Sequence, residues 1–275
     1  PPHIPRSFCS WCHHQPGLGR QMRLAGKRPR IPHVLQSHNW DCGLACVEMA
    51  MRALGVAPHE CSLRTLRTRV PSTSVWTVDL VHIICSFGVK FRFLTTTIGV
   101  NPLYKNEAFY NKTLDVDRDR VSDLFERASG SGIEIERRSV SDDELRELTG
   151  APHDSLVMAL VDRRYLYRAS SNSVSGFIES CFALLHDSWA YSGGYIGHYV
   201  LLTGFDEARD GYYLLDPAKQ CDELFVHSEH LHAARRAHGT DEDLIVIPWD
   251  QPAAVQGEQR KPLAKCSNSA VAAAG

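Results

Sequence analysis

Hydrophobic residues recur at helical spacing between residues 36 and 55, and this stretch organises the prediction for the rest of the chain. They lie three or four positions apart, as on one buried face of a helix: Leu44, Val47, Met51 and Leu54. Asp41 is a residue type that favours a helix N-cap, and Gly55 is a typical C-terminal stop. The pattern therefore predicts a buried helix whose first turn contains Cys42.

The remaining hydrophobic pattern predicts further helices and strands as far as residue 247. Helices are expected over residues 75–88, 106–110, 118–129, 141–148 and 228–237. Strands are expected over residues 90–98, 132–140, 156–161, 198–205, 212–215 and 244–247. The strands either side of the turn at 206–211 should pair as a hairpin, and the serine-rich stretch 168–194 is expected to be an inserted loop. This order predicts an α+β fold with helices packed against a largely antiparallel sheet.

Three regions follow from the same pattern. Residues 1–30 are rich in Pro, Gly, Arg and His and should form a disordered basic arm, whereas residues 31–250 should form a single domain. Residues 251–275 are expected to be a disordered tail. Within the arm, residues 9–13 match the C-x-x-C-H haem-attachment pattern and contain metal-ligand types. No second ligand cluster follows, so neither a haem nor a metal site is adopted.

Composition narrows the class of protein. The 275 residues are 43% hydrophobic and 23% charged, as in a soluble globular protein with a sizeable core. The formal net charge of -2 provides no electrostatic basis for binding nucleic acid. Nine irregularly spaced cysteines favour reduced thiols in an intracellular, cytoplasmic protein. No apolar run is long enough to span a membrane. Because the chain begins at Pro1, we expect it to be part of a longer chain, so a targeting signal stays open. Nothing in the sequence indicates the oligomeric state.

Cys42 and Gln36 are candidates for nucleophilic chemistry. A cysteine in the first turn of a helix lies next to unpaired N–H groups and the positive end of the helix dipole, which stabilise a thiolate. Gln36 lies just outside the helix, where its amide could donate a hydrogen bond to a developing oxyanion. The competing interpretation is that Cys42 only packs in the core, as most lone cysteines do.

His198 and Asp216 would complete such a site. His198 opens a buried strand, and Asp216 ends the next strand of the expected hairpin. Pairing would bring the carboxylate to the imidazole, where it would fix the tautomer and stabilise the imidazolium of a Cys-His-Asp triad. Alternatively, His198 is a buried histidine bonded to backbone, and Asp216 a turn residue before Pro217. No metal site is assigned: Asp206, Asp210 and Asp216 cluster in sequence, but a solvated turn explains them better.

Several motifs resemble known families. Gln36 with Asp41-Cys42-Gly43, Gly197-His198-Tyr199-Val200 and Asp216-Pro217 resemble the double-glycine-leader cysteine peptidase domains of bacteriocin-exporting ABC transporters, which have a papain-like fold. A closer resemblance, to the plant-type soluble guanylyl cyclase family and the animal guanylyl cyclase domain-containing proteins, covers about residues 31–250. It rests on residues 32–36, Trp40-Asp41-Cys42-Gly43-Leu44-Ala45-Cys46, Trp76-Thr77-Val78-Asp79-Leu80, Phe109-Tyr110, residues 197–200 and Gly239-Thr240-Asp241-Glu242-Asp243.

The resemblances imply different activities. The guanylyl cyclase family implies conversion of GTP to cyclic GMP and pyrophosphate, a lyase reaction that uses Mg²⁺ or Mn²⁺ with GTP. The papain-like resemblance implies a cysteine peptidase or thiol hydrolase acting on a peptide or acyl substrate, with no cofactor. A non-catalytic binding protein that uses the same cleft is the third interpretation.

Overall fold

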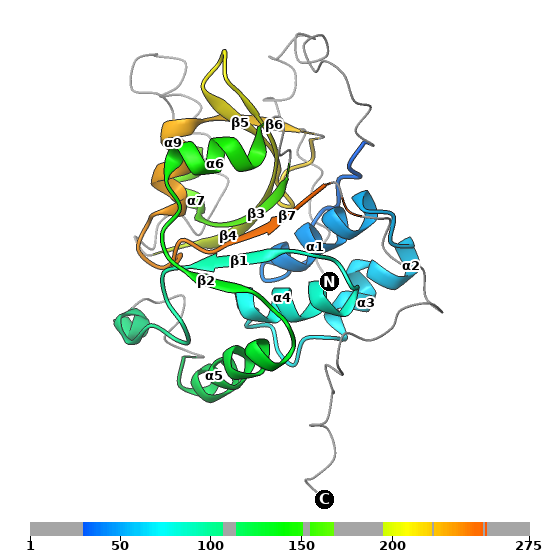
Figure 1. Ribbon diagram of the computed structural model, residues 1–275, viewed down its shortest axis with the longest axis vertical. Helices are drawn as coiled ribbons and strands as arrows, with labels where there is room; N and C mark the ends of the chain where they lie inside the picture. The colour runs from blue at the N-terminus through cyan, green and yellow to red at the C-terminus, as the bar shows by residue number, and fades with distance from the viewer. Residues whose placement is uncertain are drawn as a thin grey trace, which may run out of the picture.

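The computed structural model describes residues 30–106, 114–150, 155–167, 195–221, 223–249 and 251. Nearly all of the predicted basic arm and of the tail, the whole 168–194 insertion and residues 9–13 lie outside these ranges. The helices, including the 3-10 helix η3, are α1 (Cys42–Ala53), α2 (Pro58–Cys61), α3 (Leu63–Arg67), α4 (Thr77–Ser86), η3 (Pro102–Asn106), α5 (Leu114–Gly130), α6 (Asp142–Thr149), α7 (Arg163–Leu166) and α9 (Ser228–Arg235) (Figure 1). None of these helices is long and apolar enough to cross a membrane.

Seven strands form one sheet in the order β2-β1-β7-β3-β4-β5-β6. The strands are β1 (Arg92–Thr95), β2 (Ile135–Arg137), β3 (Leu156–Asp162), β4 (Gly197–Asp206), β5 (Gly211–Leu215), β6 (Leu224–His227) and β7 (Leu244–Ile247). Only the β1–β2 pair at one edge is parallel, and every other pair in this sheet is antiparallel. The fold is therefore a mixed α/β arrangement around a mostly antiparallel sheet, which confirms the coarse prediction.

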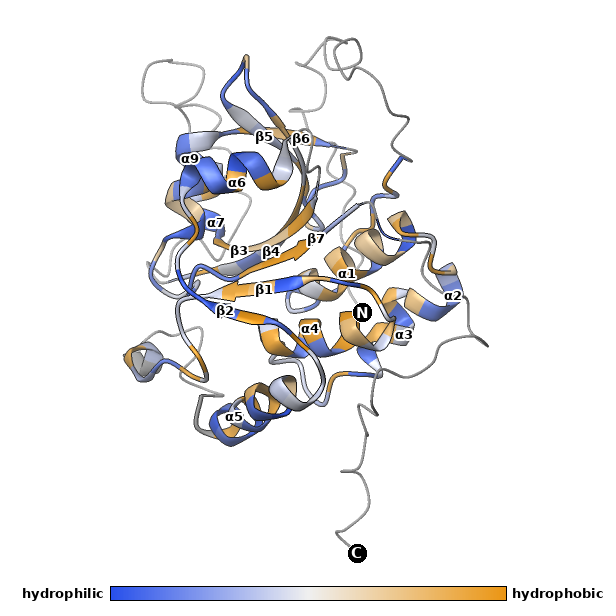
Figure 2. Cartoon of the chain, in the orientation of Figure 1, coloured by the Kyte–Doolittle hydropathy of each residue, from blue (hydrophilic) through white to orange (hydrophobic). Residues whose placement is uncertain are grey.

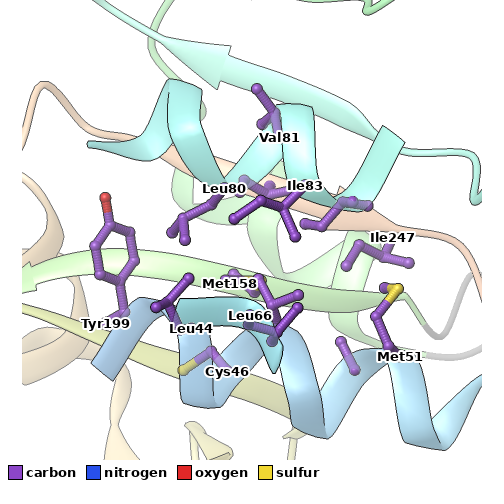
Figure 3. Close-up of a cluster of buried hydrophobic side chains, with 14 of the residues drawn as sticks. Leu44, Cys46, Met51, Leu66, Leu80, Val81, Ile83, Met158, Tyr199 and Ile247 are labelled. Atoms are coloured by element: carbon purple, nitrogen blue, oxygen red, sulfur yellow. The ribbon is translucent and has the colours of Figure 1, made fainter. Parts of the chain in front are cut away.

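The sheet is buried on both faces. One face packs against α1 and α4, where Leu44, Leu80, Met158 and Tyr199 belong to one apolar cluster, seen between the helices and the strands in Figure 3. The opposite face forms a second cluster, whose helical members come from α6, α7 and α9. Figure 2 shows apolar colours along the central strands and polar colours over much of α5, α6 and α9. Burial on both faces explains why β3 reads as a continuous apolar run.

The differences from the sequence prediction concern short elements. Strand β1 has four residues rather than the nine expected, and β2 has three. The pattern missed α2, α3, α7 and the edge strand β6, each of four or five residues. A 3-10 helix ends at Asn106, and the rest of the helix expected over 106–110 lies outside the described ranges. Helices and strands of four or five residues are too short to show a repeating pattern of apolar positions, so hydrophobic periodicity cannot reveal them.

Candidate functional site

Cys42 is the first residue of α1, as the sequence predicts, and its side chain is buried. The helix lies between the sheet and the neighbouring helices, so every residue from Cys42 to Met51 is buried. Gly43 permits this close packing: a Cβ there would lie 2.7 Å from Leu80 Cδ1 and 3.0 Å from Tyr199 Cδ2. The start of α1 is thereby held tightly against α4 and β4.

Asp41 occupies the N-cap position, but its side chain makes no capping hydrogen bond to α1. The prediction that Asp41 is the N-cap residue is right in position, but the prediction that its side chain caps the helix is wrong. Its carboxylate instead accepts hydrogen bonds from the backbone N–H groups of Ser37 (3.1 Å) and His38 (3.0 Å) and from Arg67 Nε (2.9 Å). Because Arg67 lies on α3, Asp41 ties the loop before Cys42 to a neighbouring helix, and the side chain is not available to the α1 amides.

His198 and Asp216 are brought together as a buried pair. His198 Nε2 lies 2.7 Å from Asp216 Oδ1, and the two residues are 4% and 1% exposed. His198 is near the start of β4, and Asp216 directly follows β5, its antiparallel neighbour. The hairpin predicted from the sequence produces this contact, since it places the start of one strand beside the end of the next.

Cys42 also influences the protonation of His198. Burial alone would lower the pKa of His198, but the charge and hydrogen bond of Asp216, and then Cys42, raise this pKa from 6.5 to about 9. Because Asp216 occupies Nε2, Nδ1 is the ring nitrogen that this carboxylate leaves free. Whether Nδ1 serves the Cys42 thiol belongs to the function proposed below.

The carboxylate of Asp216 is held by more groups than the sequence indicates. The backbone N–H of Ala218 donates to Oδ1 at 2.7 Å, and the Tyr167 hydroxyl donates to Oδ2 at 2.5 Å. His33 Nε2 also lies 2.9 Å from the Asp216 carbonyl oxygen. Burial favours the neutral acid, but His198 and then Tyr167 and Ala218 outweigh it and hold the pKa of Asp216 well below its usual range. Tyr167 stands in none of the motifs named above, and His33 lies in the family motif at residues 32–36, which gave no indication of this contact.

Gln36 lies beside the site, with its side chain turned to its own loop. Its backbone N–H donates to the carbonyl of Pro217 at 2.8 Å, which fastens the loop before α1 to the residue after Asp216. Its amide Nε2 donates to the His38 carbonyl at 2.9 Å. The amide Oε1 is buried and has no hydrogen-bond partner among the described residues. The role of Gln36 as an oxyanion donor stays a prediction.

Cys46, one turn after Cys42, is fully buried. Burial, and then the nearby Cys42 and Asp216 charges, raise its pKa well above the ordinary value. The Cys46 thiol therefore stays protonated at neutral pH.

The other acidic residues considered from the sequence lie apart from this site. Asp206 accepts hydrogen bonds from Arg209 N and the Tyr213 hydroxyl, and Asp210 contacts Ser228 and Arg146. Within the described residues, no group of three or more His, Cys, Asp or Glu side chains is placed to hold a metal ion.

Comparison with known proteins places these residues in a family context. The sequence profile of a family described as guanylylate cyclase matches residues 31–247, which include every residue of the site. The Arabidopsis thaliana protein named guanylyl cyclase 1 is 41% identical over 217 residues, covering 79% of this chain and 75% of that protein.

Proposed function

This chain belongs to the guanylylate cyclase family, and on that premise we propose that its site is that of a thiol hydrolase with Cys42 as the nucleophile. One observation carries the proposal: a buried imidazole is bonded at 2.7 Å to a buried carboxylate. The influence of Cys42 on the pKa of that imidazole, and its position at the start of α1, support the choice of Cys42 as the nucleophile. In this role His198 is the general base and acid, and Asp216 orients it.

The reaction that these groups support is acyl transfer. The Cys42 sulfur attacks the carbonyl carbon of a peptide or other acyl substrate, while His198 holds the proton taken from the thiol. The carbonyl oxygen becomes an oxyanion, for which the Cys42 N–H and the Gln36 amide are the proposed donors. When the tetrahedral intermediate collapses, the C–N or C–O bond breaks and His198 protonates the leaving group. Water, activated by His198, then hydrolyses the thioester and restores the thiol.

The arrangement of elements supports a papain-like interpretation of the fold. In such an enzyme the nucleophile begins a buried helix, and the histidine and its partner lie on adjacent antiparallel strands. Here α1 begins at Cys42 and packs on β4, while His198 and Asp216 lie at adjoining ends of β4 and β5. The papain-like fold forms part of the same proposal.

The second candidate function is conversion of GTP to cyclic GMP and pyrophosphate, which is favoured by the name of the family and of the Arabidopsis relative. In that reaction the ribose 3′-oxygen attacks the α-phosphorus, and pyrophosphate leaves with its bridging oxygen. Mg²⁺ or Mn²⁺ would enter with the nucleotide and balance the charge of the phosphates. Under this function Cys42 has a structural role, so the two candidates differ in their dependence on its thiol.

A test of the thiol proposal is the rate at which iodoacetamide labels each cysteine, read by mass spectrometry. We expect Cys42 to label faster near neutral pH than the half-exposed Cys221, although Cys42 is the more buried of the two. His198→Ala should slow Cys42 labelling by roughly tenfold or more, and Asp216→Asn by less, because Asp216 acts only through His198. His59→Ala, on the exposed surface of α2, is the control and should leave the rate unchanged.

A parallel assay separates the second function. Wild type and Cys42→Ser would each be incubated with GTP and Mn²⁺, and cyclic GMP would be measured. Equal cyclic GMP formation by both proteins, with an unreactive Cys42, would discard the thiol mechanism and support the cyclase. A reactive Cys42 without cyclic GMP would support the hydrolase. Neither reactivity nor cyclic GMP would leave a binding protein.

A further inference from the structure

The second carboxylate oxygen of Asp216 has its own donor, which the triad does not require. Oδ1 receives His198 Nε2 and Ala218 N, both at 2.7 Å, while Oδ2 receives the Tyr167 hydroxyl at 2.5 Å. Asp216 is 1% exposed, so a water molecule cannot easily replace a hydrogen-bond partner that the carboxylate loses. The Tyr167 contact thus decides whether both oxygens of a buried charge are satisfied.

Tyr167 is held in place from two directions. It follows the short helix α7, which begins directly after β3, and β3 pairs with β4 so that Val161 lies opposite His198. Above its ring, the Lys219 ammonium lies 5.1 Å from the ring centroid. Lys219 belongs to the turn after β5, because its backbone N–H donates to the carbonyl of Asp216 at 3.1 Å. The turn that contains Asp216 therefore also contacts the ring of Tyr167, through Lys219.

We propose that Tyr167 is a positioning residue of this site, whose hydroxyl fixes the plane of the Asp216 carboxylate so that Oδ1 faces His198. This proposal rests on the thiol function proposed above, in which Asp216 acts through the imidazole. A carboxylate held at one oxygen can turn about its Cβ–Cγ bond, whereas donors on both oxygens fix its orientation.

The hydroxyl remains a donor across the working pH range. Burial, and then the Asp216 charge, raise the pKa of Tyr167 well above its ordinary value of 10, so the phenol keeps its proton. It therefore donates to the ionised form of Asp216, which is the form that favours the imidazolium. Loss of the hydroxyl should leave Asp216 ionised but free to turn, which weakens its hydrogen bond to His198 without any change at Cys42 or His198 itself.

The test is the titration of His198 followed by ¹⁵N NMR of the histidine rings in Tyr167→Phe. A hydrogen bond to a charged group shifts a pKa by about one unit or more. Because a loosened Asp216 carboxylate bonds His198 less well, we expect the pKa of His198 to fall by about one unit from its wild-type value near 9. Tyr165→Phe is the matched control. Tyr165 lies on the same turn, with Arg164 Cζ 5.6 Å from the centroid of its ring, and the substitution should leave the His198 midpoint unchanged. A folded Tyr167→Phe protein with the wild-type midpoint would overturn the proposal.

A second measurement needs no change at Tyr167. In the wild-type protein, a tyrosine hydroxyl proton held against a buried carboxylate should exchange slowly and shift when His198 titrates. A spectrum in which no tyrosine hydroxyl resonance follows that titration contradicts the proposal, even if Tyr167→Phe fails to fold. Both readouts observe histidine and tyrosine rather than the thiol. A slow-labelling Cys42 with an intact Tyr167 effect would therefore reject the hydrolase and keep the positioning role.

Discussion

At the scale of single residues, the two buried carboxylates nearest the site, Asp41 and Asp216, each have charged or hydrogen-bonding partners. Asp41 is fully buried beside Cys42, and Arg67 contacts it through Nε and a second guanidinium nitrogen. Asp216 is buried in the same way against His198 and Tyr167. Removing one partner of such a pair is costly because the other charge stays buried without compensation.

Arg67→Ala tests this arrangement. The substitution leaves the Asp41 carboxylate with two backbone donors and the His38 ring (Nδ1 to Oδ2, 3.3 Å) but without the guanidinium, so we expect a loss of about 2–3 kcal/mol in the free energy of unfolding. Urea titration would measure the loss. Arg64→Ala, on the exposed side of the same helix α3, should change stability by less than about 0.5 kcal/mol. Equal effects of the two substitutions would show that Arg67 acts only as a surface residue.

At the scale of elements, the starts of α6 and α1 differ in whether a side chain caps them. Helix α6 is capped by the Ser141 hydroxyl, which accepts from the Glu144 N–H at 3.1 Å. The Ser141-x-x-Glu144 spacing predicts a reciprocal capping box, but the Glu144 carboxylate pairs with Arg138 instead. At α1 the Asp41 side chain is turned toward Arg67. The first N–H groups of α1 therefore have no side-chain cap, which suits a start that would stabilise a thiolate.

Ser141→Ala should destabilise the protein by about 1 kcal/mol, because it removes an acceptor from the first turn of α6. Ser141→Asp keeps an acceptor and adds a negative charge at the helix start, so it should retain wild-type stability. Thermal or urea unfolding of the three proteins measures the difference. If Ser141→Asp loses as much as Ser141→Ala, the hydroxyl is not acting as a cap.

At the scale of the whole molecule, two buried groups make stability depend on pH in the same direction. His198 has a folded-state pKa of about 9, so the stability from its charge is complete below 6.5 and is lost as pH rises toward 9. Asp243 contacts Thr77 and is buried; burial, and then the Asp241 charge, raise its pKa from 3.8 to about 8. The folded protein therefore holds protons that the unfolded chain has already released.

We expect the free energy of unfolding to fall as pH rises from about 6 to 9, by roughly 5 kcal/mol, of which each group contributes about half. Urea titrations at several pH values would measure the slope. Asp243→Asn removes one titrating group and should flatten the curve below about pH 8, while leaving the part that belongs to His198. A wild-type stability that rises over this range would contradict both assignments.

Local patterns were enough to predict the elements that bury a continuous face. The spacing of apolar residues located α1 and its first residue Cys42, and the apolar runs located β3 and β4. The hairpin between β4 and β5 was also a local prediction, and it accounts for the contact of His198 with Asp216 across 18 residues of sequence. Burial imposes a period on the sequence wherever one helix or strand faces a core, so these features can be read directly from it.

Only the tertiary structure decided the contacts that surround this pair. Arg67 meets Asp41 across 26 residues, Tyr167 meets Asp216 across 49, and His33 meets the Asp216 backbone across 183. The edge strand β6 likewise exists through its pairing with β5. Each contact depends on where the folded chain brings two distant segments together, and a single polar side chain that meets a distant partner leaves no period in the sequence.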